Sequence, residues 1–167
     1  MKKKIFIPFF EIKQIMKKVK EWPYEDKINL YLFFILKQAW ESYSEIRRQM
    51  KISKNKKEEY IQIIEEIVKS KKNKHYLYFS DKEILFLLNK KKYKKYLYLI
   101  ITLKINLMFS NYYIITRNRL IQHFFNYNIN NKNVTRKIIE GLNELKENKL
   151  IKSYKKDKNK FFFYKKY

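Results

Sequence analysis

The sequence predicts a mainly α-helical chain with one small β-hairpin near the C-terminus, organised as two related units. Apolar residues recur three and four apart over most of the chain, and this spacing indicates amphipathic helices. After residue 149 the pattern changes to two short extended runs around the polar turn DKNK, which is typical of a hairpin. The same order of predicted elements occurs in both halves, and this repetition indicates two units.

The composition combines a large basic excess with enough apolar residues for a core. The chain has 167 residues, of which 46% are hydrophobic and 18% aromatic, and it can form one or two small domains. Its 40 Lys and Arg against 16 Asp and Glu give a formal net charge of +24. Abundant Lys, Asn, Ile, Tyr and Phe are typical of an AT-rich genome, but such a bias does not make acidic residues scarce. A polyanionic partner is therefore predicted, and nucleic acid is the commonest one.

Residues 116 to 151 have the pattern of a helix, a turn, a second helix and a strand. The first helix, 116 to 125, is predicted from the apolar residues Leu120, Ile121, Phe124 and Phe125 on one side. After the turn NYNINN, Asn130 is the predicted cap of the second helix. The predicted buried stripe of that helix consists of Val134, Ile138, Leu142 and Leu145. Leu150 and Ile151 then begin the extended region.

Residues 129 to 151 resemble the recognition helix and first wing strand of winged helix-turn-helix DNA-binding proteins. The resemblance consists of the apolar turn residue Ile129, the polar cap Asn130, Val134 and Arg136 in the first turn, and the ending Leu150-Ile151. Many members of that family have a glycine where this chain has Asn148-Lys149. We therefore expect the asparagine to end the helix in a left-handed conformation.

The resemblance implies where this surface would contact DNA, because the start of the recognition helix enters the major groove in that family. It implies base-reading roles for Asn131, Lys132, Asn133, Thr135 and Arg136. It implies phosphate contacts for Arg117, Arg119, Lys137, Lys155, Lys156, Lys158 and Lys160. Asparagine suits adenine and arginine suits guanine in such contacts. The alternative is a helix and hairpin whose lysines only coat the outside.

An internal repeat extends the resemblance to the first half. LYLFFILK (30 to 37) and LYLIITLK (97 to 104) share a pattern, and each precedes a short helix, a turn, a helix and an extended run. In the first half, Ser53 is the predicted cap of the later helix, and the extended run is 75 to 79. The repeat indicates tandem winged-helix units, 1–74 and 75–167, and a capping box formed by Ser80 and Glu83 opens the second. Coincidence in a biased composition is the alternative.

The two candidate recognition helices differ in charge. The first contains four carboxylates that would oppose phosphates in a groove, namely Glu58, Glu59, Glu65 and Glu66. The same acids, spaced by seven, are otherwise typical of a solvated, ion-paired face. We therefore expect residues 1–74 to serve dimerisation or phosphate contacts, and 75–167 to bind DNA.

Aromatic residues fill four consecutive positions of the second hairpin strand, 161 to 164. Because alternate residues of a strand face opposite sides, Phe161 and Phe163 can pack on the core while Phe162 and Tyr164 face outward, or the reverse. Outward rings beside lysines could stack on unpaired bases, or pack against the N-terminal unit or a second subunit.

Signals for enzyme chemistry and for membranes are weak. The chain has no cysteine, and its single glycine, Gly141, excludes glycine-rich phosphate loops. His75 and His123 lie far apart in the sequence. The apolar runs 28–36 and 96–103 are shorter than the roughly 20 residues of a membrane span. We expect no enzymatic activity, no cofactor, no metal and no membrane contact, and a cytoplasmic location in association with the nucleoid or a plasmid.

The sequence thus predicts a protein that binds double-stranded DNA in a sequence-specific manner and can form a homodimer. In architecture it resembles the tandem winged-helix plasmid replication initiators, although it is shorter and its first unit lacks a clear wing hairpin. That resemblance implies replication initiation or its control on a plasmid, phage or other mobile element. A transcriptional repressor, or a plasmid partition or transfer accessory protein, would use the same surface. A non-specific coating or RNA-binding protein and a protein-interaction module are alternatives of another class.

Overall fold

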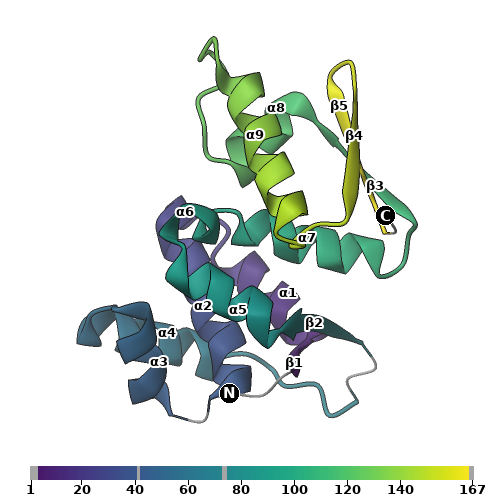
Figure 1. Ribbon diagram of the computed structural model, residues 1–167. Coiled ribbons are helices and arrows are strands. Elements are labelled where there is room, and N and C mark those ends of the chain that lie inside the picture. The colour runs from purple at the N-terminus through teal and green to yellow at the C-terminus, as the bar shows by residue number, and fades with distance from the viewer. Residues whose placement is uncertain (1–3, 41, 73–74, 166–167) are drawn as a thin grey trace. The chain divides into compact units, whose positions relative to one another are not determined.

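The chain forms two compact units in the computed structural model, which describes residues 4–40, 42–72 and 75–165. Unit 1 is Met1–Leu97 and unit 2 is Tyr98–Tyr167. Within these ranges, each unit combines helices with one small antiparallel sheet, of two strands in unit 1 and three in unit 2 (Figure 1). The prediction of a mainly α-helical chain with a small hairpin is therefore confirmed.

Unit 1 contains β1 (Lys4–Pro8), α1 (Phe9–Lys18), α2 (Tyr24–Ala39), α3 (Tyr43–Met50), α4 (Lys54–Glu65), β2 (Tyr76–Ser80), α5 (Asp81–Asn89) and the short α6 (Lys91–Lys94). Helix α2 is its core, because every residue from Leu30 to Leu36 is buried and this middle part of the helix is apolar on all sides. The predicted extended run at 75–79 is strand β2, shifted by one residue.

The pairing of β1 with β2 places the division between the units later than the sequence indicates. Ile5 lies opposite Phe79 and Ile7 opposite Leu77, and all four side chains are buried. This pairing holds β2 in unit 1, so the division along the chain falls after Leu97 and not after residue 74. A strand pair so distant in sequence leaves no local signal.

Helix α1 also fixes the segment that follows α4. The backbone N–H of Ser70 donates to Glu11 Oε1 over 3.0 Å. Gln14 exchanges two hydrogen bonds with the backbone of Val68, of 2.8 and 3.3 Å. Lys18 forms an ion pair with Glu66. Three residues on one stripe of α1 therefore hold every second residue of the segment 66–70.

Side-chain caps set the start of several helices in unit 1. Ser53 Oγ accepts a hydrogen bond from the backbone N–H of Lys56 at 3.2 Å, as predicted for the helix that becomes α4. Ser80 and Glu83 form the predicted capping box at the start of α5. Such caps are local in sequence, which explains why they were predictable.

Unit 2 contains α7 (Leu97–Leu107), which begins at the division, β3 (Tyr112–Thr116), α8 (Arg117–Arg119), the π-helical turn η1 (Leu120–Phe124), α9 (Val134–Glu147), β4 (Ser153–Asp157) and β5 (Lys160–Tyr164). The strands lie in the order β3-β5-β4, so the C-terminal strand is central and β4 and β5 form a hairpin (Figure 1).

The core of unit 2 contains the predicted apolar residues. The buried stripe of α9 consists of Val134, Ile138, Leu142 and Leu145. The apolar side of α8 and η1 is also buried, at Leu120, Ile121, Phe124 and Phe125. Phe161 and Phe163 pack inward from β5, which decides between the two orientations that alternation allowed. The only glycine, Gly141, is buried in α9.

Two predicted helix boundaries in unit 2 are wrong. Helix α9 starts at Val134 and not next to Asn130, because the asparagines before it form turns of their own. At the other end Asn148 is not left-handed, since its φ is −88°, and Lys149 has the positive φ of 62° instead. Asn148 caps the helix through its side chain, which donates to the carbonyl oxygen of Glu144 at 2.8 Å.

The repeat holds for the helices but not for the sheets. Both LYL motifs lie in long buried helices, α2 and α7, and each is followed by a short helix, a turn and a longer helix. Unit 2 has a strand between its first two helices and a hairpin after the third. In unit 1 the described residues hold neither, and β2 pairs with a strand that precedes α1. Among the described residues, no helix has the length and hydrophobicity needed to cross a membrane.

Candidate nucleic-acid interface

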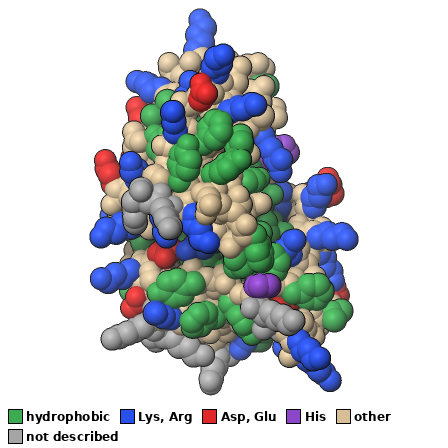
Figure 2. All heavy atoms as spheres, turned by 90° about the vertical axis from the view of Figure 1, so that its right-hand side faces the viewer, with side chains coloured by type: hydrophobic (Ala, Val, Ile, Leu, Met, Phe, Trp, Pro, Cys, Tyr) green, Lys and Arg blue, Asp and Glu red, His purple; other side chains and the backbone are tan. Residues whose placement is uncertain are grey.

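Basic residues outnumber acidic ones most strongly in unit 2. Residues 98–167 contain 15 Lys and Arg against 4 Asp and Glu, compared with 25 against 12 in residues 1–97. On the face drawn in Figure 2, Lys and Arg side chains are widespread and Asp and Glu are few. The surface as a whole therefore attracts polyanions, and geometry decides which part of it forms a defined site.

The start of α9 is an exposed basic end of a helix. Lys132, Arg136 and Lys137 are all exposed, and no acidic residue lies in the first turn. A helix N-terminus carries partial positive charge from its free N–H groups, so cations at this end repel that charge while an anion would be attracted.

Arg117 connects the start of α9 with the turn of the hairpin. Its Nε donates to Thr135 Oγ1 at 2.7 Å, in the first turn of α9. Its backbone N–H donates to the carbonyl oxygen of Asn159 at 2.7 Å, in the turn between β4 and β5. The helix start and the hairpin turn therefore lie against the same residue, in the upper part of unit 2 in Figure 1.

A second contact holds the hairpin nearer the C-terminal end of α9. The hydroxyl of Tyr154 donates to Asn143 Oδ1 at 2.5 Å. Burial raises the pKa of Tyr154 above its usual value, so the hydroxyl keeps its proton at physiological pH. Together with Arg117, this contact fixes the hairpin along the helix. Sequence reasoning missed both contacts, because neither pair is adjacent in the chain.

The lysines of the hairpin are exposed but point to different sides. Lys155 lies opposite Phe162 on β5, whereas Lys156 lies opposite the buried Phe161, and neighbouring residues of a strand face opposite sides. Lys158 occupies the turn with a positive φ of 52°, a conformation that glycine or asparagine adopts more easily. Lys160 begins β5 and is exposed.

The asparagines before α9 differ in how well they could contact a base. Asn131 Oδ1 accepts the backbone N–H of Asn133 at 3.0 Å, and a two-point contact with adenine needs both atoms of the amide. Asn131 would have to give up this turn to make such a contact. Asn133 is exposed, and its side chain does not cap the helix.

Of the predicted base-reading residues in α9, Thr135 and Arg136 have different surroundings. Thr135 is half-buried, and its hydroxyl accepts from Arg117, so it positions neighbours. Arg136 is 69% exposed and lies 3.9 Å from Glu140, a distance and exposure at which an ion pair contributes little. Glu140 and Glu147 follow on the exposed side of the helix, so its later turns are less suited to phosphates.

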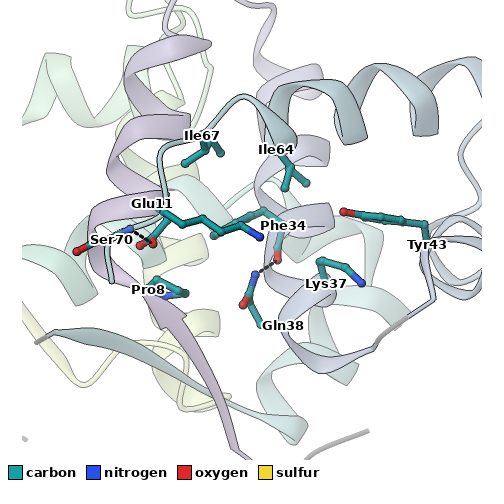
Figure 3. Close-up of a pocket in the computed structure, with 10 residues that line it drawn as sticks. Pro8, Glu11, Phe34, Lys37, Gln38, Tyr43, Ile64, Ile67 and Ser70 are labelled. Atoms are coloured by element: carbon teal, nitrogen blue, oxygen red, sulfur yellow. Dashed lines mark hydrogen bonds between the residues drawn. The ribbon is translucent and has the colours of Figure 1, made fainter. Parts of the chain in front are cut away.

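Unit 1 contains a cavity of about 340 Å³ between helices (Figure 3). It is lined by Pro8, Glu11, Phe34, Lys37, Gln38, Tyr43, Ile64, Ile67, Lys69 and Ser70. Its polar groups already contact one another, since Glu11 accepts from Ser70 and Gln38 donates to the carbonyl oxygen of Phe34 at 3.4 Å. Lys37 Nζ lies 4.5 Å from the centre of the Tyr43 ring. This lining selects no particular ligand.

Chemistry of other kinds has little support among the described residues. No three of their His, Asp and Glu side chains lie close enough to hold a metal ion. His75 belongs to unit 1 and His123 to unit 2. In α4, Lys56 is paired with Asp26 at 3.3 Å and with Glu59 at 3.6 Å, which fits an ion-paired face.

No protein-family model matches this chain, and no curated protein or solved structure is significantly similar to it. The function is therefore inferred from the residues and geometry of the chain itself.

Proposed function

We propose that unit 2 is a winged helix-turn-helix and that it binds duplex DNA through α9 and the β4–β5 hairpin. The order of its elements supports this proposal: α7, β3, α8 with η1, α9, β4 and β5. In this interpretation α9 is the recognition helix and the hairpin is the wing. The central position of β5 also fits, because it joins the wing to the strand that precedes the helix-turn-helix.

The observation that carries the proposal is the bridge formed by Arg117. It brings the exposed cations at the start of α9 beside the turn of the lysine-rich wing. A helix start that enters the major groove needs its neighbouring surface to meet the flanking phosphates, since phosphate contacts set the register of the protein on DNA. Because Arg117 holds the start of α9 beside the hairpin turn, the helix can enter the groove while the hairpin lysines contact the flanking phosphates.

The roles follow from exposure and hydrogen bonding. Arg136 is the residue we propose for a two-point contact with guanine, and Asn133 for one with adenine. Thr135 positions Arg117. Phosphate contacts are proposed for the exposed cations Arg119, Lys132, Lys137, Lys155, Lys156, Lys158 and Lys160. Because Glu140 and Glu147 follow, we propose that only the first turns of α9 lie in the groove.

The process served is proposed from the resemblance alone. The chain would act in replication initiation or its control on a mobile element, with unit 1 as a dimerisation module. Unit 1 shares the order of helices with unit 2 but not the sheet, so a second winged helix has less support there than in unit 2.

A selection from random duplex DNA by the full-length protein tests the proposal at about 150 mM salt, where non-specific phosphate binding is weak. We expect one enriched motif, alone or repeated, and a relaxed preference at one base pair for Arg136→Ala. Arg48→Ala is the matched control, because Arg48 is an exposed arginine of unit 1. No enrichment by the unchanged protein would overturn sequence-specific binding.

A further inference from the structure

The outer face of the two-stranded sheet in unit 1 is aromatic and exposed. Phe6 is 55% exposed, Tyr76 44% and Tyr78 39%. Both strands alternate between exposed and buried residues, so these rings lie on one face, and the residues next to them in sequence, Ile5, Ile7, Leu77 and Phe79, pack inward. Figure 2 shows hydrophobic side chains among Lys and Arg on one face of the molecule.

The three rings form one continuous group. The centre of the Phe6 ring lies 5.9 Å from that of Tyr78, its partner on the neighbouring strand. It lies 6.3 Å from that of Tyr76, at nearly a right angle. We call Phe6, Tyr76 and Tyr78 the aromatic ribbon. Its members stay partly exposed although they touch, so part of each ring is accessible to a ligand.

One cation lies against the aromatic ribbon, and a second lies on the helix that follows β1. Lys4 Nζ is 5.5 Å from the centre of the Tyr78 ring. Lys13 Nζ, on α1, is 5.1 Å from the centre of the Phe9 ring, and the Phe9 backbone N–H donates to the carbonyl oxygen of His75, which precedes Tyr76. The outer-face positions of β1 and β2 hold no carboxylate, since they are Lys4, Phe6, Pro8, Tyr76, Tyr78 and Ser80.

This chemistry distinguishes between partners. An exposed group of large apolar side chains marks an interaction site. Aromatic rings serve protein interfaces as well, but this face carries Lys4 and no carboxylate, so its charge favours a polyanionic ligand. Rings flanked by lysines match a chain of flat bases on a phosphate backbone, as in proteins that stack single strands on a sheet.

We propose that the aromatic ribbon binds single-stranded nucleic acid by stacking two or three unpaired bases, with Lys4 and Lys13 near the backbone phosphates. This activity goes beyond duplex recognition, because it uses unit 1 and needs bases that are not paired. It does not depend on the wing or on α9.

The test measures binding of the full-length protein to labelled oligothymidylate and oligouridylate about 12 nucleotides long, by fluorescence anisotropy. We expect Phe6→Ala and Tyr78→Ala each to weaken binding roughly 5- to 150-fold. Phe6→Leu should weaken it nearly as much, since leucine keeps apolar area but lacks a flat ring. The control is Leu85→Ala, because Leu85 is 44% exposed on α5 of the same unit and has no ring.

The outcomes separate cleanly. Stronger binding of the thymidylate or of the uridylate assigns DNA or RNA as the source of the unpaired bases, provided that the ring variants weaken it. Unchanged binding in Phe6→Ala, full activity of Phe6→Leu, or an equal loss in Leu85→Ala would overturn the proposal. Photocrosslinking of iodouracil-substituted strands adds a direct check, with Tyr76 or Tyr78 expected and crosslinks confined to unit 2 as the contrary result. If the protein binds single strands through these rings but selects no duplex motif, the proposed duplex recognition by unit 2 is contradicted and the single-strand proposal stands.

Discussion

Two junctions between a strand and a helix, one in each unit, have the same design and opposite charge. In unit 1, β2 ends at Ser80, whose hydroxyl accepts the backbone N–H of Glu83 at 3.1 Å. In unit 2, β3 ends at Thr116, whose hydroxyl accepts the backbone N–H of Arg119 at 3.4 Å. The third residue after the cap is thus a glutamate in unit 1 and an arginine in unit 2.

The difference shows that basic residues are concentrated at the helix starts of unit 2, so the basic excess is not only a matter of overall composition. Acidic residues occupy the first turns of α1, α2, α3 and α5 in unit 1, where they stabilise a helix, whereas the first turns of α4 and α6 have none. The first turns of α8 and α9 have none and carry arginine or lysine instead. A genome bias acts on both units alike, so it does not explain this contrast. An anionic partner at unit 2 would offset the local repulsion.

The largest expected effect tests whether the two units are separate folding units. Phe161→Ala removes a fully buried ring from the central strand of unit 2, and such a change destabilises by about 3–5 kcal/mol. We expect amide hydrogens of β3 and α9 to exchange faster, as measured by peptide-resolved mass spectrometry. Protection in α2 should stay the same.

The matched variant in unit 1 is Phe79→Ala, which removes an equally buried ring from β2. It should speed exchange in β1 and α2 and leave unit 2 protected. If either variant exposes both units equally, the chain unfolds as one body, and the comparison between two units loses its basis.

The second prediction concerns the charged end of α9. Arg136→Ala should reduce discrimination at one base pair by about 1–3 kcal/mol, because a two-point contact is lost. Lys158→Ala should weaken all duplexes alike and lower the salt dependence by about one unit. Quantitative competition between the selected site and random duplex measures both. Equal effects of the two variants on the two kinds of DNA would contradict the division between base reading and phosphate binding.

The third prediction compares the two caps. Ser80→Ala removes one half of a reciprocal capping box, and Thr116→Ala removes a single, longer bond. Losses of about 0.5–2 kcal/mol are typical of such caps, and we expect the Ser80 variant to be nearer the upper end. Denaturant unfolding followed by circular dichroism and exchange measures each. A larger loss for Thr116→Ala would mean that the reciprocal bond adds nothing.

The elements that were predictable depend on residues close in sequence. The stripe from Val134 to Leu145 and the alternation at Phe161 to Tyr164 follow from the period of each element, and the structure reproduces both. Ser53 and Ser80 cap residues three positions away. In each case the determining contacts lie within one element or its first turn.

What was not predictable depends on distant or competing contacts. The pairing of Ile5 with Phe79 joins two strands that are separated in sequence by the helices α1 to α4. Before α9, Asn128 and Asn131 each bind a backbone N–H two residues on, and these turns compete with an early helix start at Asn130. The bridge from Arg117 to Thr135 and Asn159 needs three separate elements in place, so the sequence identified a basic residue but not its positioning role.

The smallest expected effect exchanges the charge that distinguishes the two junctions. Arg119→Glu would give unit 2 the pattern of unit 1, a hydroxyl cap followed three residues later by a glutamate. Replacing a cation by an anion near a helix N-terminus should stabilise unbound unit 2 by about 0.3–1 kcal/mol at low salt. The same change should weaken binding to every duplex, because a proposed phosphate contact becomes a repulsion.

Denaturant unfolding measures the change in stability, and fluorescence anisotropy with labelled duplex measures the change in binding, both on one preparation. Glu83→Gln in unit 1 is the control for losing a charge at the matching position. Opposite signs in stability and binding would mean that Arg119 is retained for a partner at the expense of the fold. Weaker stability together with unchanged binding would show that the basic junction of unit 2 serves the fold, and the contrast between the units would then need another explanation.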